Sequence, residues 1–137
     1  MEKTGKSSLL ITLLGRSEEG IRKDALNIFG SFDKVITVKR DKDTLAEGRD
    51  DCLTAKETIE FLRENSCRHN DDDDWPVYTN VTLVANGGTT AQLVPILLEL
   101  VSWDINSESG ELTSYYQKNI VEIDRDLNVT KYCRLVF

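Results

Sequence analysis

Apolar residues in the N-terminal part of the chain alternate between unbroken runs and helical spacing. Residues 9–14 (LLITLL) form a continuous run, the pattern of a parallel strand covered on both faces. Ser17 is a suitable helix N-cap, apolar side chains recur at helical spacing over residues 21–29, and Gly30 is placed to end that helix. Residues 34–39 are β-branched and predict a second strand, so the segment predicts a parallel strand-helix-strand unit.

A second helix is predicted by a capping box. Thr54 and Glu57 stand three residues apart before an apolar face, so each side chain can bond the other's backbone N–H. The charged segments on either side, residues 40–52 and 65–76, lack periodicity and are predicted to be loops.

The third unit of the chain is again a strand followed by a helix. Residues 80–85 are predicted to form the strand, and residues 86–90 (NGGTT) the turn. A helix from about residue 90 to residue 103 follows. It is apolar nearly all round, so we expect it to be the most buried helix, with a kink at Pro95.

The end of the chain reads as a β-hairpin. Its arms are predicted over residues 116–123 and 129–137, with a turn near residues 124–126. Together the patterns predict one α/β domain over residues 1–137, with residues 1–8 frayed. The fold class is Rossmann-like: a mostly parallel sheet, helices on both faces and a C-terminal β-hairpin.

Composition and charge narrow the function. The chain has 137 residues and a formal net charge of −7, whereas proteins that coat duplex nucleic acid normally carry excess Lys and Arg. We therefore expect no duplex nucleic acid partner. No apolar run is long enough to span a membrane and no signal peptide is recognisable, so we expect a cytoplasmic protein without a membrane partner.

The sequence predicts no cofactor and no metal site. The chain has three cysteines, and no two of them form a CxxC pair. The aspartate run at residues 71–74 lacks the glycine-turned spacing and the closing glutamate of a calcium loop, and a solvated loop is the simpler interpretation.

The best candidate site is the turn at residues 86–90. Gly87 and Gly88 allow positive φ and a close approach of the backbone to a ligand. The helix that follows offers free N–H groups and a positive dipole end, which favour an anion. The alternative is a tight strand-helix connection that binds nothing.

The turn after the first predicted strand belongs to the same edge of the sheet, because the carboxyl ends of parallel strands lie together. Gly15 ends that strand, and Arg16 and Ser17 follow it. Arg16 could supply positive charge to a bound phosphate, and Ser17 a hydroxyl or a helix-start N–H. The plainer alternative is an N-cap beside a solvated arginine.

These two turns resemble those of the CRISPR-associated Rossmann-fold (CARF) family. The resemblance implies a homodimer that binds cyclic oligoadenylate in a groove across the dimer axis. The glycine-turn N–H groups would hold phosphates, Ser17 and Thr89 would bond phosphate or ribose, and Arg16 would offset charge. The candidate ligand-binding residues are Gly15, Arg16, Ser17, Asn86, Gly87, Gly88, Thr89 and Thr90.

The resemblance leaves the activity open between a messenger sensor and a metal-independent ring nuclease. In a ring nuclease of this family the ligand's own 2′-hydroxyl attacks the phosphate. The family's glycine motif commonly continues with a lysine where this chain has Thr90, and Ser17 and Arg16 are the catalytic candidates that remain. Two rival functions stay open: a Rossmann-like enzyme or sensor for a mononucleotide or sugar phosphate, and a protein-interaction domain without a small ligand.

Overall fold

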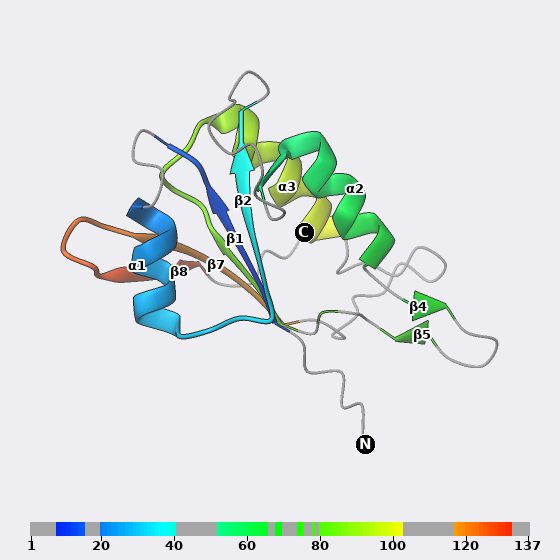
Figure 1. The fold of residues 1–137 in the computed structure, drawn as a ribbon, viewed down its shortest axis with the longest axis horizontal. Coiled ribbons are helices and arrows are strands. Elements are labelled where there is room, and N and C mark those ends of the chain that lie inside the picture. Colours follow the sequence, from blue (N-terminus) through cyan, green and yellow to red (C-terminus); the bar gives the residue numbers. More distant parts are fainter. Residues whose placement is uncertain are drawn as a thin grey trace.

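One six-stranded sheet organises the molecule (Figure 1). The strand order is β3-β2-β1-β6-β7-β8, and every neighbouring pair is parallel except β7 and β8. The strands are β1 (Ser8–Leu13), β2 (Lys34–Lys39), β3 (Cys52–Thr54), β6 (Asn80–Val84), β7 (Gln117–Ile123) and β8 (Val129–Tyr132). The computed structural model describes residues 8–15, 20–40, 52–65, 68–69, 74–75, 78, 80–102 and 117–132.

Helices cover both faces of the sheet. Helix α1 (Gly20–Phe29) lies on one face, and α2 (Ala55–Asn65) and α3 (Thr90–Ser102) lie side by side on the other (Figure 1). Alternate residues of β1 divide between two cores: Leu9 and Ile11 pack toward α2 and α3, whereas Leu10 packs toward α1. This two-sided burial explains the unbroken apolar run in β1, and it confirms the predicted Rossmann-like α/β class.

The strand order places a topological switch point between β1 and β6. From β1 the chain moves outward to β2 and β3, and then returns past β1 to β6 and β7. The connections that follow β1 and β6 therefore leave the sheet in opposite directions. Ligands of open α/β sheets bind in the crevice at such a point, outside the carboxyl ends of the strands.

The C-terminal hairpin is confirmed for its described residues. Strands β7 and β8 are antiparallel, and the Asp124 carboxylate accepts the N–H groups of Asp126 and Asn128 in the turn between them. Leu127 completes the turn with a φ of 65°. The last residues of the predicted second arm, 133–137, lie outside the described part of the chain.

Two predicted loops contain short strands. Cys52, assigned from sequence to a loop, is the first residue of β3 and pairs with Thr37 of β2. Within residues 65–76, Asn65 ends α2, and β4 (Arg68–His69) pairs with β5 (Asp74–Trp75) in a separate antiparallel ribbon. Strands of two or three residues are too short to produce an alternating pattern, so the sequence carried no signal for them.

The expectation that the third helix is the most buried one is confirmed for the described residues, since α3 has three buried residues and α2 and α1 have fewer, but α3 is not buried all round. Gln92, Ile96 and Leu100 of α3 are buried, but Val94 is 39% exposed and Leu98 is 63% exposed. Helix α3 packs against the sheet and α2 on two sides. Its remaining side faces away from these contacts, so apolar residues there are exposed. Pro95 lies inside α3, which continues beyond it to Ser102.

The predicted capping box of α2 is present, and it gives a stability prediction. The Thr54 N–H donates to Glu57 Oε1 at 3.0 Å, and the Glu57 N–H donates to Thr54 Oγ1 at 3.1 Å. We expect Thr54→Ala to lower the free energy of unfolding by about 1 kcal/mol, because it leaves one helix-start donor without its acceptor. Urea denaturation measures the change. Glu64→Ala, at an exposed position in the last turn of the same helix, is the control; equal losses in both variants would contradict the capping role.

Candidate functional site

The turns after β1 and β6 touch at the carboxyl edge of the sheet. A Cβ atom built on Gly15 would collide with the carbonyl oxygen of Gly87. The backbones of two segments far apart in sequence are therefore packed directly against each other at the switch point, as the sequence predicted for this edge. Arg16 and Ser17 lie outside the described residues.

The two glycines of the second turn are required by packing inside the protein. Gly87 has a φ of 104°, and a Cβ there would lie 2.9 Å from the side chain of Ile21 on α1. A Cβ on Gly88 would lie 2.6 Å from Leu13 Cβ and 2.7 Å from Gln92 Oε1. The turn lies flat on β1 and α1, and this contact requires glycine whether or not a ligand is bound.

Gln92 connects the turn to the ends of two strands. Its side chain is 2% exposed. Its Oε1 accepts the Thr89 N–H at 2.6 Å, while its Nε2 donates to the carbonyl oxygens of Leu14 at 3.0 Å and Val38 at 2.7 Å. One amide therefore holds the carboxyl ends of β1 and β2 against the start of α3.

Thr89 is the N-cap of α3 in this arrangement. Its Oγ1 accepts the Gln92 N–H at 3.3 Å, and its own N–H is bound by Gln92. Thr89 and Gln92 form a second capping box, which the sequence analysis missed although the Thr-x-x-Gln spacing is visible. Thr90, the first residue of the helix, is exposed.

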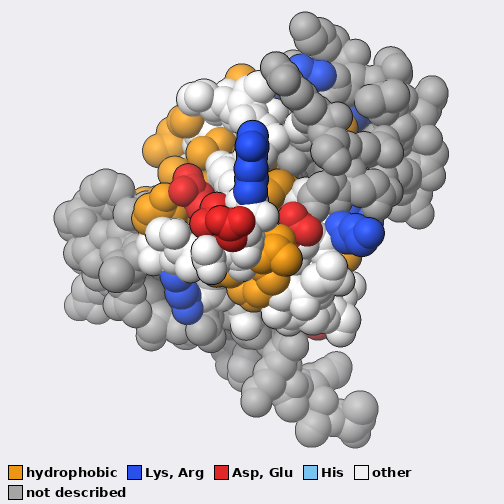
Figure 2. Space-filling view, turned by 90° about the vertical axis from the view of Figure 1, so that its left-hand side faces the viewer, with side chains coloured by type: hydrophobic (Ala, Val, Ile, Leu, Met, Phe, Trp, Pro, Cys, Tyr) orange, Lys and Arg blue, Asp and Glu red, His pale blue; other side chains and the backbone are white. Residues whose placement is uncertain are grey.

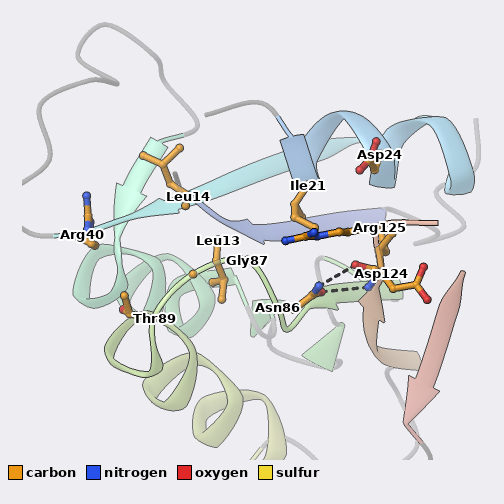
Figure 3. Close-up of a pocket in the computed structure, with 13 residues that line it drawn as sticks. Leu13, Leu14, Ile21, Asp24, Arg40, Asn86, Gly87, Thr89, Asp124 and Arg125 are labelled. Carbon is orange, nitrogen blue, oxygen red and sulfur yellow. Dashed lines mark hydrogen bonds between the residues drawn. The ribbon is translucent and has the colours of Figure 1, made fainter. Parts of the chain in front are cut away.

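Asn86 binds the neighbouring strand. Its Nδ2 donates to the carbonyl oxygen of Ile123 at 2.7 Å, and its Oδ1 accepts the Ile123 N–H at 3.1 Å. The side chain therefore extends the pairing of β6 and β7 and holds the turn at Asp124 and Arg125 beside the glycine turn (Figure 3). Of the predicted residues, Asn86 and Thr89 each make side-chain contacts within the protein that sequence reasoning did not foresee.

Backbone donors remain at the start of α3. Within the described ranges, no hydrogen bond uses the N–H of Gly87, Gly88, Thr90 or Ala91. Donors at a helix start, together with the positive end of the helix dipole, favour an anion. The feature that can bind a phosphate is thus the backbone of the turn rather than its side chains.

A pocket of about 830 Å³ is lined by Gly87 and Gly88. Figure 3 shows it running along the carboxyl edge, with Arg40 and Thr89 at one end and Asp124 and Arg125 at the other. Its lining residues are Leu13, Leu14, Gly15, Ile21, Asp24, Arg40, Asn86, Gly87, Gly88, Thr89, Ile123, Asp124 and Arg125.

Two arginines in this lining were missed from sequence. Arg40 follows β2, and Arg125 lies in the turn between β7 and β8. Both are remote in sequence from the glycine turn, and only the strand order brings their segments to one edge. The carboxylates of Asp24 and Asp124 balance them in the lining.

The described side chains on the surface around α1 include both positive and negative charges (Figure 2). Figure 2 shows acidic and basic side chains there beside apolar ones. Among the described residues, no three His, Cys, Asp or Glu side chains are grouped to hold a metal ion, and no helix is long and apolar enough to cross a membrane.

Comparison with known proteins gives this chain no family. No family model matches it, and the search of curated proteins found no match. What can be assigned is the class that the fold defines: a Rossmann-like α/β domain with a pocket at its topological switch point.

Proposed function

We propose that this domain binds a cyclic oligoadenylate as a homodimer, with ligand phosphates at the glycine turn after β6. The observation that carries the proposal is the pair of unused backbone N–H donors of Gly87 and Gly88 in the lining of the switch-point pocket. The resemblance of the two turns to the CARF family supplies the ligand class, and the contact between Gly15 and Gly87 is consistent with it.

The backbone donors and the two arginines of the pocket suit a phosphodiester, although the Asp24 and Asp124 carboxylates in the same lining offset part of that positive charge. Backbone N–H groups recognise phosphate oxygens without a formal charge, and Arg40 and Arg125 supply positive charge at the two ends of the pocket. Phosphates arranged around a ring would be shared between two copies of the site, since a ring ligand and a dimer can have the same twofold axis.

Metal-independent cleavage of the ring belongs to the same proposal. It would need a 2′-hydroxyl of the ligand aligned with its own phosphate, and cations to stabilise the charge that develops on the phosphate oxygens. Arg16 and Ser17 remain the proposed catalytic residues. A sensor would need only binding.

A mononucleotide or sugar phosphate is the second candidate ligand. The volume of the pocket, about 830 Å³, falls within the usual size of small-molecule sites, about 300–1,000 Å³. Such a ligand would occupy each chain separately, so the stoichiometry of binding distinguishes the two candidates.

The test is calorimetry and thermal unfolding of the purified protein with cyclic tri-, tetra- and hexa-adenylate, with linear oligoadenylate and mononucleotides as controls. A ligand at about a hundred times its dissociation constant stabilises the protein by about 2.7 kcal/mol, which raises the melting temperature measurably. One ring bound per two chains supports the proposal, and one mononucleotide per chain supports the second candidate. No stabilisation by any of these compounds contradicts both. Chromatography of the recovered ligand reports cleavage.

We expect Arg125→Ala to weaken binding of the ligand by about ten-fold, because one charge-assisted hydrogen bond to phosphate is lost. The free energy of unfolding should change little, since Arg125 is exposed in a turn. Lys131→Ala is the matched control: it removes a positive charge from β8, outside the pocket lining. Equal loss of affinity in both variants would show that only the overall charge matters.

A further inference from the structure

A second pocket lies between α2 and α3, next to the first. Its volume is about 820 Å³, and Arg40 and Thr89 line both pockets. We call this second pocket the α2–α3 groove. It is lined by Lys39, Arg40, Ala55, Lys56, Ile59, Glu60, Arg63, Thr89, Ala91, Gln92 and Pro95.

The groove concentrates positive charge. Among the described residues of its lining, four side chains are cationic and Glu60 is the one anionic side chain, in a chain whose formal net charge is −7. Arg63 is held beside the groove by Glu99, with its Nε donating to the carboxylate at 3.0 Å. A concave site with an excess of one sign of charge raises the local concentration of the opposite sign. The groove therefore attracts anions even though the whole protein repels them.

The groove is lined by both cationic and apolar side chains. Lys39 and Arg40 come from the carboxyl end of β2, and Lys56 comes from the first turn of α2. Ile59 and Pro95, from facing positions on α2 and α3, supply apolar surface. The first turns of both helices also border the groove, which adds their positive dipole ends to the field of the lysines.

We infer that the α2–α3 groove is a second phosphate-binding site, for a phosphate ester whose organic part rests on Ile59 and Pro95. Lys39 and Lys56 hold the phosphate, and Arg40 stands at the boundary with the switch-point pocket. Gly87 and Gly88 are not in the lining of the groove, although Arg40 and Thr89 line both pockets, so the inference goes beyond the proposed function.

The inference is tested by a ¹H–¹⁵N NMR titration of the full chain with adenosine 5′-monophosphate, which reports each site by its own amide signals. The expected result is a saturable shift of the Ala55, Lys56 and Ala91 signals. In the Lys39→Ala/Lys56→Ala double variant, the dissociation constant read from Ala55 and Ala91 should rise by about ten-fold or more, because two charge-assisted contacts are lost. Lys131→Ala should leave it unchanged. Unaltered signals from β1 show that each variant is folded.

Other outcomes would overturn the inference. Shifts confined to Gly87 and Gly88 would place the nucleotide in the switch-point pocket alone, and would still support the second candidate ligand there. Groove shifts that survive in the double variant would exclude the lysines as phosphate ligands. A titration with adenosine, which lacks the phosphate, is the last control. If adenosine shifts the groove signals as much as adenosine 5′-monophosphate does, the groove recognises the nucleoside and not the phosphate. Groove shifts with unaltered Gly87 and Gly88 signals would support the second site while arguing against the first for this probe.

Discussion

Gly15→Ala is expected to lower the free energy of unfolding by about 3 kcal/mol and to abolish ligand binding at the switch-point pocket. The added methyl group would occupy the position of the Gly87 carbonyl oxygen. Backbone atoms cannot move aside as a flexible side chain can, so the turns after β1 and β6 must separate. Separation displaces the donors at the start of α3. Urea denaturation measures the stability, and calorimetry with the ligand identified for the wild-type chain measures the binding.

Gly30→Ala is the matched control for this prediction. Gly30 follows α1 with a φ of 92°, and a Cβ there would meet no atom within 4 Å. Alanine at that position is strained by its backbone angle alone, at a cost of about 1 kcal/mol. We expect binding to survive in this variant. If Gly15→Ala lowers the free energy of unfolding and the affinity for the ligand no more than Gly30→Ala does, the turns can separate freely and do not form a fixed site.

Gln92→Ala is expected to lower the free energy of unfolding by about 3 kcal/mol. The substitution removes the donors that reach Leu14 and Val38 and the acceptor of the Thr89 N–H. Buried polar groups that lose their partners are costly, and the missing side chain also leaves a cavity. Thr90→Ala, at the exposed first position of α3, is the control and should change the stability much less.

Gln92→Glu keeps the acceptor of the side chain but removes its N–H donors, and it should make the stability of the variant depend on pH. The carboxylate can still accept the Thr89 N–H, but when ionised it faces the carbonyl oxygens of Leu14 and Val38 without a proton to donate. Burial beside these oxygens should raise the carboxyl pKa in the folded state above its unfolded value of about 4.3. The variant should therefore become more stable relative to wild type as the pH falls through the folded-state pKa. A stability difference independent of pH would contradict the proposed contacts.

The sequence predicted those elements whose signals are local. The bounds of β2, residues 34–39, and the capping box at Thr54 and Glu57 are confirmed, because a β-branched run and a three-residue spacing are complete within a few positions. Gly30 has the positive φ expected of a residue that ends a helix. Strand β3 could not be predicted, since its three residues are ordered by pairing with β2.

The site was predictable in place but not in detail. The glycine turn and its position at the sheet edge followed from strand-helix patterns, whereas the contacts of Gln92 cross 78 and 54 residues of sequence to Leu14 and Val38. Arg40 and Arg125 join the pocket through the strand order, which no local pattern contains. From the sequence, the glycines were explained by the close approach of a ligand to the backbone. The structure adds a second reason, which is the packing of Gly88 against Leu13.

The Gln92 amide also affects which parts of the protein lose conformational entropy when a ligand binds. Because one buried side chain ties together the ends of β1 and β2 and the start of α3, the backbone donors of the turn are preorganised before a ligand arrives. Little backbone freedom is then left to lose on binding. The loss falls instead on the exposed side chain of Arg125, at up to about 2 kcal/mol. Affinity in this pocket should thus be limited by the ordering of the Arg125 side chain rather than by rearrangement of the turn.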